Sequence, residues 1–488
     1  MKILPSQHKI IKFITAAVFL FILSPSSLLL SQDRFRRSPP APDPLASLSL
    51  PQIETQMLAN GLSLSLVQIK DMPITRISLI IHAGEYLSPD AYPGLATFTS
   101  SLITTGTQTL STGVLEEIIE TIGGEFTTET SLGYSMYNFS FLEDYLDTAL
   151  ETLSQLIVEP GFFPRDIENI KRSIFYDIFG QRNSPDFLAK RLLYQILFDD
   201  HAAEKLVYSE DIIKEFSRES IIEYYNRYYV PNNAQFLLVG DLDLSTASRK
   251  VTRFFSRWQK KEIPLSNFDP PVPSQKIKIC FVDMPQVKNA TIFLGNTIAP
   301  FQAEAINPFS VFNRVLGETT NSRIFMNLRE SKGYAYFAFS QLEMFENFGV
   351  FYIRAKVRSD VVTESIKEIL REIQAIQQKA IPVLQIEQAK SSLIGSFPLK
   401  ILELSGFSRK VADILIHDLG NDQWSKYYEN IMQVSSRSVY DLIKNYFLLT
   451  PVVVVIGNRE LILDALNAEF EEVAIYDQKG DIIEPSIR

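Results

Sequence analysis

Residues 94–107 read GLATFTSSLITTGT, and this stretch carries most of what the chain says about its fold and chemistry. We expect it to form a helix rich in hydroxyl side chains. It has no histidine, cysteine or acidic residue, so it lacks both the groups that bind zinc and a base for hydrolysis. Ser100 and Ser101 have no neighbouring base to activate a serine, and the chain contains no G-x-S-x-G motif. The stretch therefore predicts a helix without hydrolytic chemistry of its own.

The same stretch nevertheless resembles the zinc helix of the insulinase/pitrilysin peptidases, whose pattern is roughly G-L-A-H-F-x-E-H-x-x-x-x-G-T. Thr97, Ser100 and Ser101 stand where that family has its two histidines and its glutamate. The resemblance implies a peptidase fold, whereas the substitutions argue against peptidase chemistry in this chain. The positions that fit the pattern are Gly94, Leu95, Ala96, Phe98, Gly106 and Thr107.

A third zinc ligand of that family, a glutamate, lies on a later helix. Residues 170–185 resemble this helix, and Pro185 sets a register that places Asp177 at the ligand position. One carboxylate, a methylene shorter than glutamate, cannot hold zinc when the other two positions are hydroxyls. We expect Asp177 to be a solvated or hydrogen-bonded helix acid, and we expect no metal in this chain.

The four histidines of the chain do not suggest a substitute metal site. His8 belongs to the N-terminal segment that we interpret below as an export signal, and none of the other three, His82, His201 and His417, has a histidine three to five residues away. A lone histidine is more often structural or solvated than a ligand. A metal site assembled from distant residues, which would make the chain an autonomous metalloendopeptidase, is the alternative.

Residues 321–337 read NSRIFMNLRESKGYAYF and resemble a second signature of the same family, S-R-L-F…L-R-E…G-L-A-Y. In the family an arginine and a tyrosine seven residues apart bind the substrate backbone near the scissile bond. The resemblance carries these roles to Arg329 and Tyr336, whose guanidinium and phenol can donate hydrogen bonds to a peptide carbonyl. The alternative is that Arg329 pairs with a nearby acid and Tyr336 packs in a sheet.

The chain repeats itself. The tripeptide DMP occurs at residues 71–73 and again at 283–285. Two amphipathic helices and two closing apolar strands recur at a similar offset, which indicates duplication. We expect each half to be an α+β domain with helices packed on one face of a mainly antiparallel sheet. The further matches are residues 77–81 with 291–294 (the latter ending at Gly295), 144–157 with 363–377, 220–229 with 438–447, and 236–240 with 452–457.

The resemblance covers both halves, roughly residues 50–476, and implies a clamshell that closes around a peptide. It also implies that the glycine turn at residues 123–126 leads into an edge strand, residues 127–141, that pairs with substrate through its backbone. Tyr134, Met136 and Asn138 would then share one face of that strand.

The domain boundaries follow from proline-rich stretches, which resist regular structure. Residues 264–273, PLSNFDPPVP, divide the chain almost evenly, and another such stretch precedes the first half. The predicted order is an export segment at 1–31, a tether at 32–49, an N-terminal domain at 50–262, a linker at 263–275, a C-terminal domain at 276–478 and a tail at 479–488.

The N-terminus resembles a signal peptide. Three lysines precede an apolar run at residues 13–23, which Pro25 ends. Such a run is shorter than a membrane span and suits the core of a signal peptide. We expect an exported protein, periplasmic if bacterial, with cleavage near Ser31; an uncleaved inner-membrane anchor is the alternative.

The composition is that of a globular protein, with 488 residues, 46% hydrophobic and 21% charged. The net charge of −10 does not indicate nucleic-acid binding. The only cysteine, Cys280, excludes an internal disulfide, and its apolar surroundings predict a buried thiol.

Some insulinase-family enzymes consist of two chains, one with the zinc helix and one without it that keeps the arginine–tyrosine pair. This chain resembles the second kind. We therefore expect a non-catalytic subunit that binds a peptide substrate, with zinc held by a partner chain carrying H-x-x-E-H. A structural or peptide-binding scaffold without a role in proteolysis is the alternative from another class.

Overall fold

The computed structural model describes residues 50–264, 268–298, 303–420, 423, 425–446 and 450–484, all of which belong to one compact unit. The predicted export segment and tether, residues 1–49, lie outside the described residues. Within these ranges, no helix combines the length and apolar character of a membrane span.

The first half contains a six-stranded sheet among the described residues, in the order β1-β2-β6-β3-β5-β4. Its neighbouring strands are antiparallel except for β2 and β6, which are parallel. The strands are β1 (Glu54–Met57), β2 (Ser63–Gln68), β3 (Ile74–Ile81), β4 (Glu125–Thr130), β5 (Ser135–Leu142) and β6 (Ala234–Gly240).

The second half contains a seven-stranded sheet in the described ranges, in the order β13-β12-β7-β11-β8-β10-β9. The β7–β11 and β7–β12 pairs are parallel, and the remaining pairs are antiparallel. The strands are β7 (Lys278–Asp283), β8 (Asn289–Ile298), β9 (Ala335–Met344), β10 (Gly349–Arg358), β11 (Val452–Gly457), β12 (Val473–Tyr476) and β13 (Ile482–Glu484).

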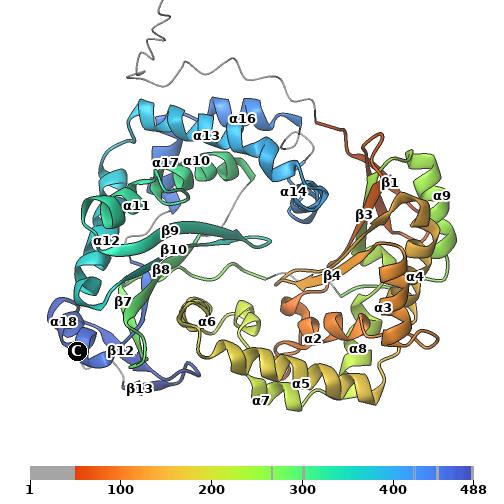
Figure 1. The fold of residues 1–488 in the computed structure, drawn as a ribbon, viewed down its shortest axis with the longest axis horizontal. Helices are drawn as coiled ribbons and strands as arrows, with labels where there is room; N and C mark the ends of the chain where they lie inside the picture. Colours follow the sequence, from red (N-terminus) through yellow and green to blue (C-terminus); the bar gives the residue numbers. More distant parts are fainter. Residues whose placement is uncertain are drawn as a thin grey trace, which may run out of the picture. The chain divides into compact units, whose positions relative to one another are not determined.

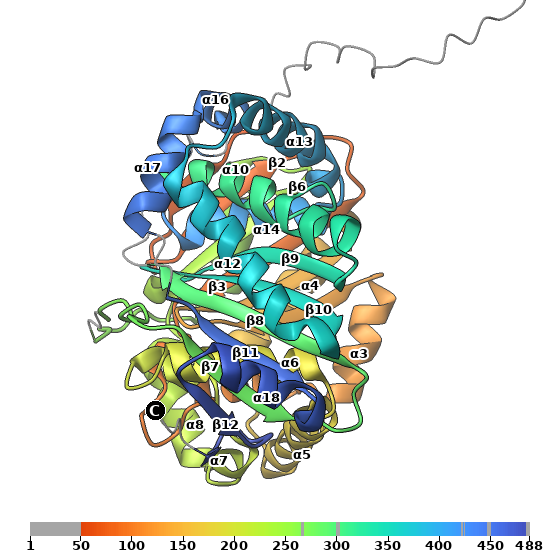
Figure 2. The same cartoon turned by 90° about the vertical axis from the view of Figure 1, so that its left-hand side faces the viewer.

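The order of five strands is the same in both sheets, because β2-β6-β3-β5-β4 corresponds to β7-β11-β8-β10-β9. Figure 1 shows the two sheets, and the order of the second set can be followed in Figure 2. Each set contains one parallel pair at the matching position, β2–β6 and β7–β11. The duplication and the α+β fold class expected from the sequence are confirmed. One detail was wrong: the strand expected to end at Gly295 continues as β8 to Ile298. The second sheet also extends into the predicted tail through β13.

Helices surround both sheets. Those of the first half are α2 (Leu95–Ile103), α3 (Thr112–Thr121), α4 (Leu146–Val158), α5 (Pro164–Gln181), α6 (Pro185–Leu197), α7 (Glu210–Lys214), α8 (Arg218–Tyr228) and α9 (Leu244–Phe254). Those of the second half are α10 (Ile306–Leu316), α11 (Arg323–Phe325), α12 (Val362–Gln378), α13 (Val383–Ile401), α14 (Leu404–Ile416), α16 (Tyr427–Gln433), α17 (Ser436–Tyr446) and α18 (Arg459–Glu469).

Both faces of each sheet are buried at its central strands, whereas the edge strands β1 and β13 are largely exposed. On β11, Val453 and Val455 pack among helices of their own half, whereas Val454 and Ile456 pack on the opposite face. Alternate side chains of a strand point to opposite faces, so a continuous apolar run such as VVVVI fits a strand covered on both sides. Cys280 on β7 is also buried, and this burial raises the pKa of its thiol to about 12.

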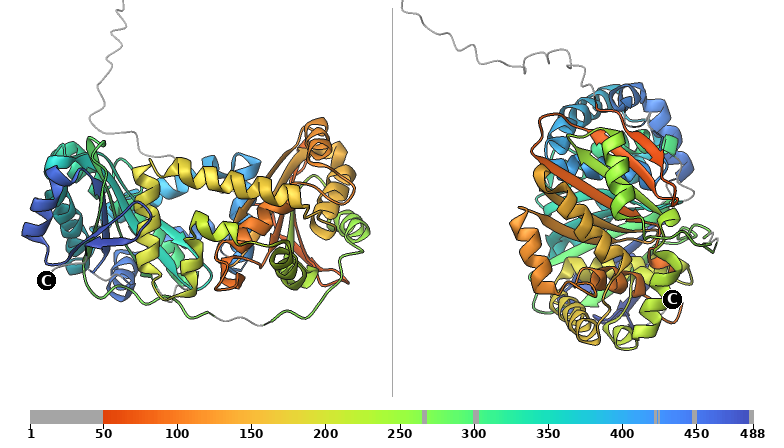
Figure 3. Two further views of the ribbon diagram at one scale, coloured as in Figure 1. Left: turned by 90° about the horizontal axis from the view of Figure 1, so that it is seen from below. Right: turned by 90° about the vertical axis from the view of Figure 1, so that its right-hand side faces the viewer.

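The second face of each sheet is covered by a helix from the other half. Helix α6 of the first half packs on β8 and β11 of the second sheet, and α14 of the second half packs on β3 and β6 of the first (Figure 2). Helix α5, yellow in the left panel of Figure 3, leads from the first half into α6. The expectation of helices on one face therefore describes only each half's own helices, and the halves exchange one helix each.

The prediction of one continuous edge strand at residues 127–141 was wrong. A turn at residues 131–134 divides it into β4, which is the edge, and β5, which is hydrogen-bonded to a strand on each side. Tyr134 and Met136 pack against the exchanged helix α14, and Asn138 of β5 accepts a hydrogen bond from Ser78. These side chains therefore do not belong to an edge that could pair with substrate.

Candidate functional site

A buried glutamate, Glu85, organises the start of α2. Its carboxylate accepts hydrogen bonds from the backbone N–H groups of Gly94 (3.0 Å) and Thr97 (2.8 Å), and from the hydroxyls of Ser88 and Thr97. The first N–H groups of a helix lack intrahelical partners, and a carboxylate there also interacts favourably with the helix dipole. Glu85 therefore caps α2 from outside the helix.

Burial raises the pKa of Glu85, and the hydrogen bonds from Thr97, Ser88 and Gly94 oppose that rise. Gly94 itself has φ +90°, and a Cβ there would lie 2.7 Å from the ring of Tyr208. Only glycine fits this conformation and this approach without strain. The G-L-A beginning of the stretch is thus explained by the sharp entry into α2.

The three hydroxyl residues of α2 have different surroundings. Thr97 donates its hydroxyl to Glu85, and Ser101 donates its own to the carbonyl of Thr97 (3.0 Å). Ser100 is buried on the opposite side, with its hydroxyl 2.7 Å from that of Thr128 on β4. Ser100 therefore belongs to the packing between α2 and the first sheet.

Thr97, Ser101 and Asp177 line one cavity of about 880 Å³. Helices α2 and α5 supply these residues from the first half, and β9 and β10 supply residues of the opposite wall, including Gln341 and Arg354. The structure thus brings together three of the four residues predicted for the degenerate site and places Ser100 outside the cavity lining. The cavity lies between the halves.

The residues of this wall do not fit a zinc ion. Two hydroxyls, one of them already bound to Glu85, and one carboxylate do not form the nitrogen, sulfur and carboxylate set that zinc requires. Among the described residues, no group of three or more histidine, cysteine, aspartate or glutamate side chains could hold a metal. The ring of His201 lies 2.6 Å from the backbone carbonyl oxygen of Asp269. The contacts of His82 with Asn233 are those of the His82 backbone: its N–H donates to the carbonyl of Asn233, and its carbonyl accepts from the side-chain amide of Asn233.

A second cluster in the cavity joins the two halves. Glu343 of β9 accepts hydrogen bonds from Lys190 of α6 (2.7 Å), from Tyr194 of α6 and from Tyr352 of β10 (2.8 Å). Burial raises the pKa of Glu343, but the opposing effect of Lys190 and the two hydroxyls is larger, so its pKa lies below the ordinary value. Glu343 is therefore an ionised group that fixes α6 to the edge of the second sheet.

Arg329 and Tyr336 lie next to each other but do not line this cavity. Arg329, in a π-helical turn at Met326–Ser331, donates a hydrogen bond to the backbone carbonyl of Tyr336, the second residue of β9. Its guanidinium also lies over the ring of Phe325 and 3.7 Å from Glu330. Of the alternative expected from the sequence, the ion pair of Arg329 with a nearby acid is present, whereas Tyr336 belongs to β9 but keeps its side chain 53% exposed.

The sequence analysis missed Glu85, Lys190 and Glu343. Glu85 lies nine residues before Gly94, so the capping pattern of adjacent residues at a helix start does not point to it. Lys190 and Glu343 are separated by 153 residues, and no local pattern links them.

The comparisons with known proteins agree with this geometry. Residues 66–210 match the family described as insulinase (peptidase family M16), and residues 215–393 match the family described as peptidase M16 inactive domain. A Bacillus subtilis protein named uncharacterized zinc protease YmxG is 22% identical over 343 residues, covering 70% of this chain and 83% of that protein.

Two further likenesses are to proteins named as inactive. A Helicobacter pylori protein named non-peptidase homolog YmxG is 22% identical over 339 residues, covering 67% of this chain and 76% of that protein. The crystal structure of a peptidase M16 inactive domain from Pseudomonas fluorescens has a TM-score of 0.77 at 19% identity, covering 83% of this chain and 98% of that one.

Proposed function

This chain belongs to the insulinase family of peptidases (M16), and on that premise we propose that it is an exported, non-catalytic subunit that holds peptide for a zinc-bearing partner. The observation that carries the proposal is the wall of Thr97, Ser101 and Asp177. These are the three positions that hold the zinc ligands in the family pattern that the chain resembles. In this chain they line one cavity but carry two hydroxyls and one short acid.

The pair formed by Arg329 and Tyr336 supports a role in holding substrate. Arg329 lies in the π-helical turn before β9 and Tyr336 near the start of β9; both side chains are exposed, and Arg329 donates a hydrogen bond to the backbone carbonyl of Tyr336. A guanidinium and a phenol in this position can donate to carbonyl oxygens of a peptide, and to an oxyanion that forms when a partner attacks the bond. The partner chain, carrying H-x-x-E-H, would supply zinc and base.

Export rests on the apolar run at residues 13–23 behind three lysines. If the source is bacterial, the proposed location is the periplasm, with the chain either cleaved near Ser31 or held by the uncleaved segment. Fusion of residues 1–50 to alkaline phosphatase would test it, because that enzyme is active only after export. An inactive fusion contradicts the proposed location.

The main test is an assay of peptide cleavage with this chain, with a candidate partner carrying H-x-x-E-H, and with both. We expect zinc-dependent cleavage only from the complex. Arg329→Ala should lower its rate by about 100- to 1,000-fold, the usual loss when one donor to a developing oxyanion is removed. Arg437→Ala, at an arginine 80% exposed on α17, is the matched control and should not change the rate.

Two results would contradict the proposal. Full zinc-dependent activity of the lone chain would establish an autonomous metallopeptidase. Assembly of a complex whose rate is unaffected by Arg329→Ala and Tyr336→Phe would instead favour the scaffold, in which the chain supports an assembly without touching substrate.

A further inference from the structure

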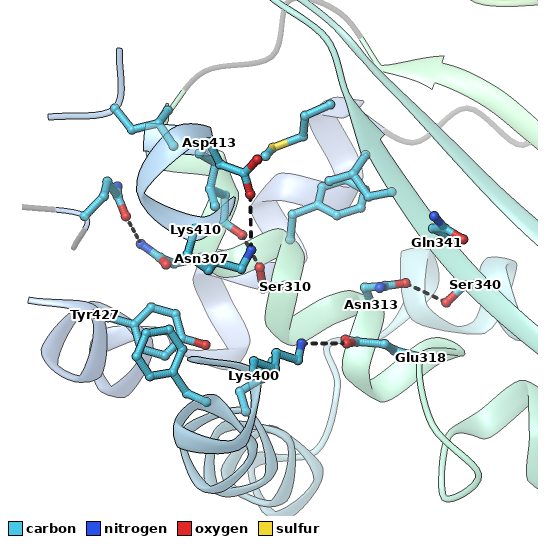
Figure 4. Close-up of a pocket in the computed structure, with 18 of the residues that line it drawn as sticks. Asn307, Ser310, Asn313, Glu318, Ser340, Gln341, Lys400, Lys410, Asp413 and Tyr427 are labelled. Atoms are coloured by element: carbon cyan, nitrogen blue, oxygen red, sulfur yellow. Dashed lines mark hydrogen bonds and ion pairs between the residues drawn. The ribbon is translucent and has the colours of Figure 1, made fainter. Parts of the chain in front are cut away.

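A second cavity, of about 630 Å³, lies within the second half, between β9 and helices α10, α13, α14 and α16 (Figure 4). It meets the cavity between the halves at Gln341 and Arg354, which line both. Its volume and its apolar lining are those of a ligand pocket. Six of the apolar residues are Phe309, Phe339, Leu342, Met344, Phe397 and Tyr427.

One wall of this cavity is the free edge of a sheet. Among the residues that the structure describes, β9 is the last strand of the second sheet and pairs only with β10. The N–H of Phe345 donates to Phe348 on the β10 side, whereas the N–H of Ser340 donates to Gly317 on the outer side. Alternation along an antiparallel strand then points the backbone groups of Leu342 and Met344 outward, beside the cavity that they line.

Two lysines at this cavity form only long ion pairs with their nearest acids. Lys400 lies 3.6 Å from Glu318, and Lys410 lies 3.4 Å from Asp413. Charge-assisted hydrogen bonds are usually about 2.7–2.9 Å long, so neither ammonium group is tightly engaged by its acid. Both lysines are about half exposed, and Figure 4 shows their ammonium groups at the cavity. With Arg354, three cations line the cavity against two acids.

We propose that this cavity binds the C-terminal end of an extended apolar peptide. The peptide adds to the outer edge of β9, places alternate side chains among the aromatic residues and directs its terminal carboxylate to Lys400 and Lys410. Strand addition uses backbone groups for affinity and pockets for specificity. The outward backbone groups of Leu342 and Met344, which have no hydrogen-bond partner in the described part of the chain, favour a peptide over a fatty acid, which has a carboxylate and an apolar body but no amides.

The duplication gives this edge a counterpart. β9 corresponds to β4, the edge strand of the first sheet, by its place in the strand order. The two edges are equivalent in topology, but the cavity with its cations belongs to the second. The inference goes beyond the proposed function, because binding here requires neither zinc nor a partner chain.

The test uses the full-length chain and a fluorescein-labelled hexapeptide of valine and phenylalanine with a free C-terminus, followed by fluorescence anisotropy. We expect saturable binding, at least about fivefold weaker binding of the C-terminal amide, and at least about tenfold weaker binding when alternate backbone nitrogens are methylated. Decanoate, as competitor, should displace the peptide poorly.

Protein variants give an independent readout. The double variant Lys400→Glu/Lys410→Glu should weaken binding of the peptide with a free C-terminus about tenfold and should hardly change binding of the C-terminal amide. Lys276→Glu, at an exposed lysine outside the cavity, should change the binding of neither peptide. Ser310→Phe fills the cavity and should abolish binding while circular dichroism confirms folding.

Equal binding of the acid, amide and methylated peptides, or unchanged binding by Ser310→Phe, would overturn the proposal. Strong displacement by decanoate together with indifference to backbone methylation would identify a fatty-acid pocket instead. Arg329→Ala should leave this binding intact, so failure here can be separated from failure of the proposed partner function.

Discussion

Lys190, on a helix of the first half, places its ammonium group 2.7 Å from the carboxylate of Glu343, on the edge strand of the second sheet. Two tyrosine hydroxyls, those of Tyr194 and Tyr352, share the same carboxylate. The four side chains form a polar connection between the halves in a largely apolar contact, so its removal affects how firmly the halves are held together.

Glu343→Ala should lower the free energy of unfolding by about 3 kcal/mol, because a partly buried lysine and two hydroxyls lose their common acceptor. Urea denaturation measures the change. The matched control is Lys276→Ala, which breaks an exposed ion pair with Glu472 and should cost less than about 1 kcal/mol. Equal effects of the two substitutions would contradict a structural role for the cluster.

The same carboxylate predicts a pH dependence. Its pKa in the folded chain lies below the ordinary value, so the unfolded state binds the proton more readily. The stabilisation is therefore present above the unfolded pKa, about 4.3, and is lost as the pH falls through the folded pKa. The difference in unfolding free energy between the native chain and Glu343→Gln should shrink between about pH 5 and pH 3. A difference that grows on acidification would show that the sign is wrong.

Removal of the cap on α2 should be costly. Glu85→Ala leaves the N–H groups of Gly94 and Thr97 without their acceptor inside the protein, and should destabilise the chain by about 3 kcal/mol. Amide hydrogen exchange of these two residues should accelerate more than that of β3. Glu116→Ala, at an exposed acid on α3, is the control and should stay within about 0.5 kcal/mol.

Gly94→Ala should destabilise the chain by at least about 2 kcal/mol, because φ is +90° and the added Cβ would meet the ring of Tyr208. Gly113→Ala is the matched control: that glycine is helical, with open space around it, and alanine should be neutral or stabilise by up to about 1 kcal/mol. Thermal unfolding of both variants measures the contrast, and similar midpoints would contradict the geometry of the α2 entry.

Restored ligands should restore a metal site. Thr97→His/Ser101→His/Asp177→Glu places two imidazoles and a carboxylate on the wall where these three residues meet, and should bind about one zinc per chain. The native chain should bind none after dialysis, as measured by elemental analysis. Moving the second histidine to Ser100, which faces Thr128 instead, should abolish binding. Stoichiometric zinc in the native chain would overturn the expectation that this chain holds no metal.

Much of the fold could be predicted because its signals are local. The helices expected at residues 144–157 and 363–377 are observed as Leu146–Val158 and Val362–Gln378, since one apolar stripe defines each. The strand at residues 127–141 was misread as continuous, because the polar residues around its turn differ little from those of an exposed strand.

The contacts between segments far apart in the sequence could not be predicted. An apolar stripe on α6 indicates that the helix is buried, but not which sheet covers it, and α6 packs on the sheet of the other half. The contact of Glu85 with Gly94 depends on a loop that returns the chain to the helix start. The degenerate positions Thr97, Ser101 and Asp177 were found through the resemblance, and their common wall only through the structure.

The exchange of α6 and α14 has a consequence for the origin of this molecule. Two identical units that exchange one helix each constitute a domain-swapped dimer. A tandem fusion of the two units of such a dimer would give this arrangement in a single polypeptide. A nick in the proline-rich connection should therefore leave two fragments that are recovered only as a pair, since each alone would have a bare apolar sheet.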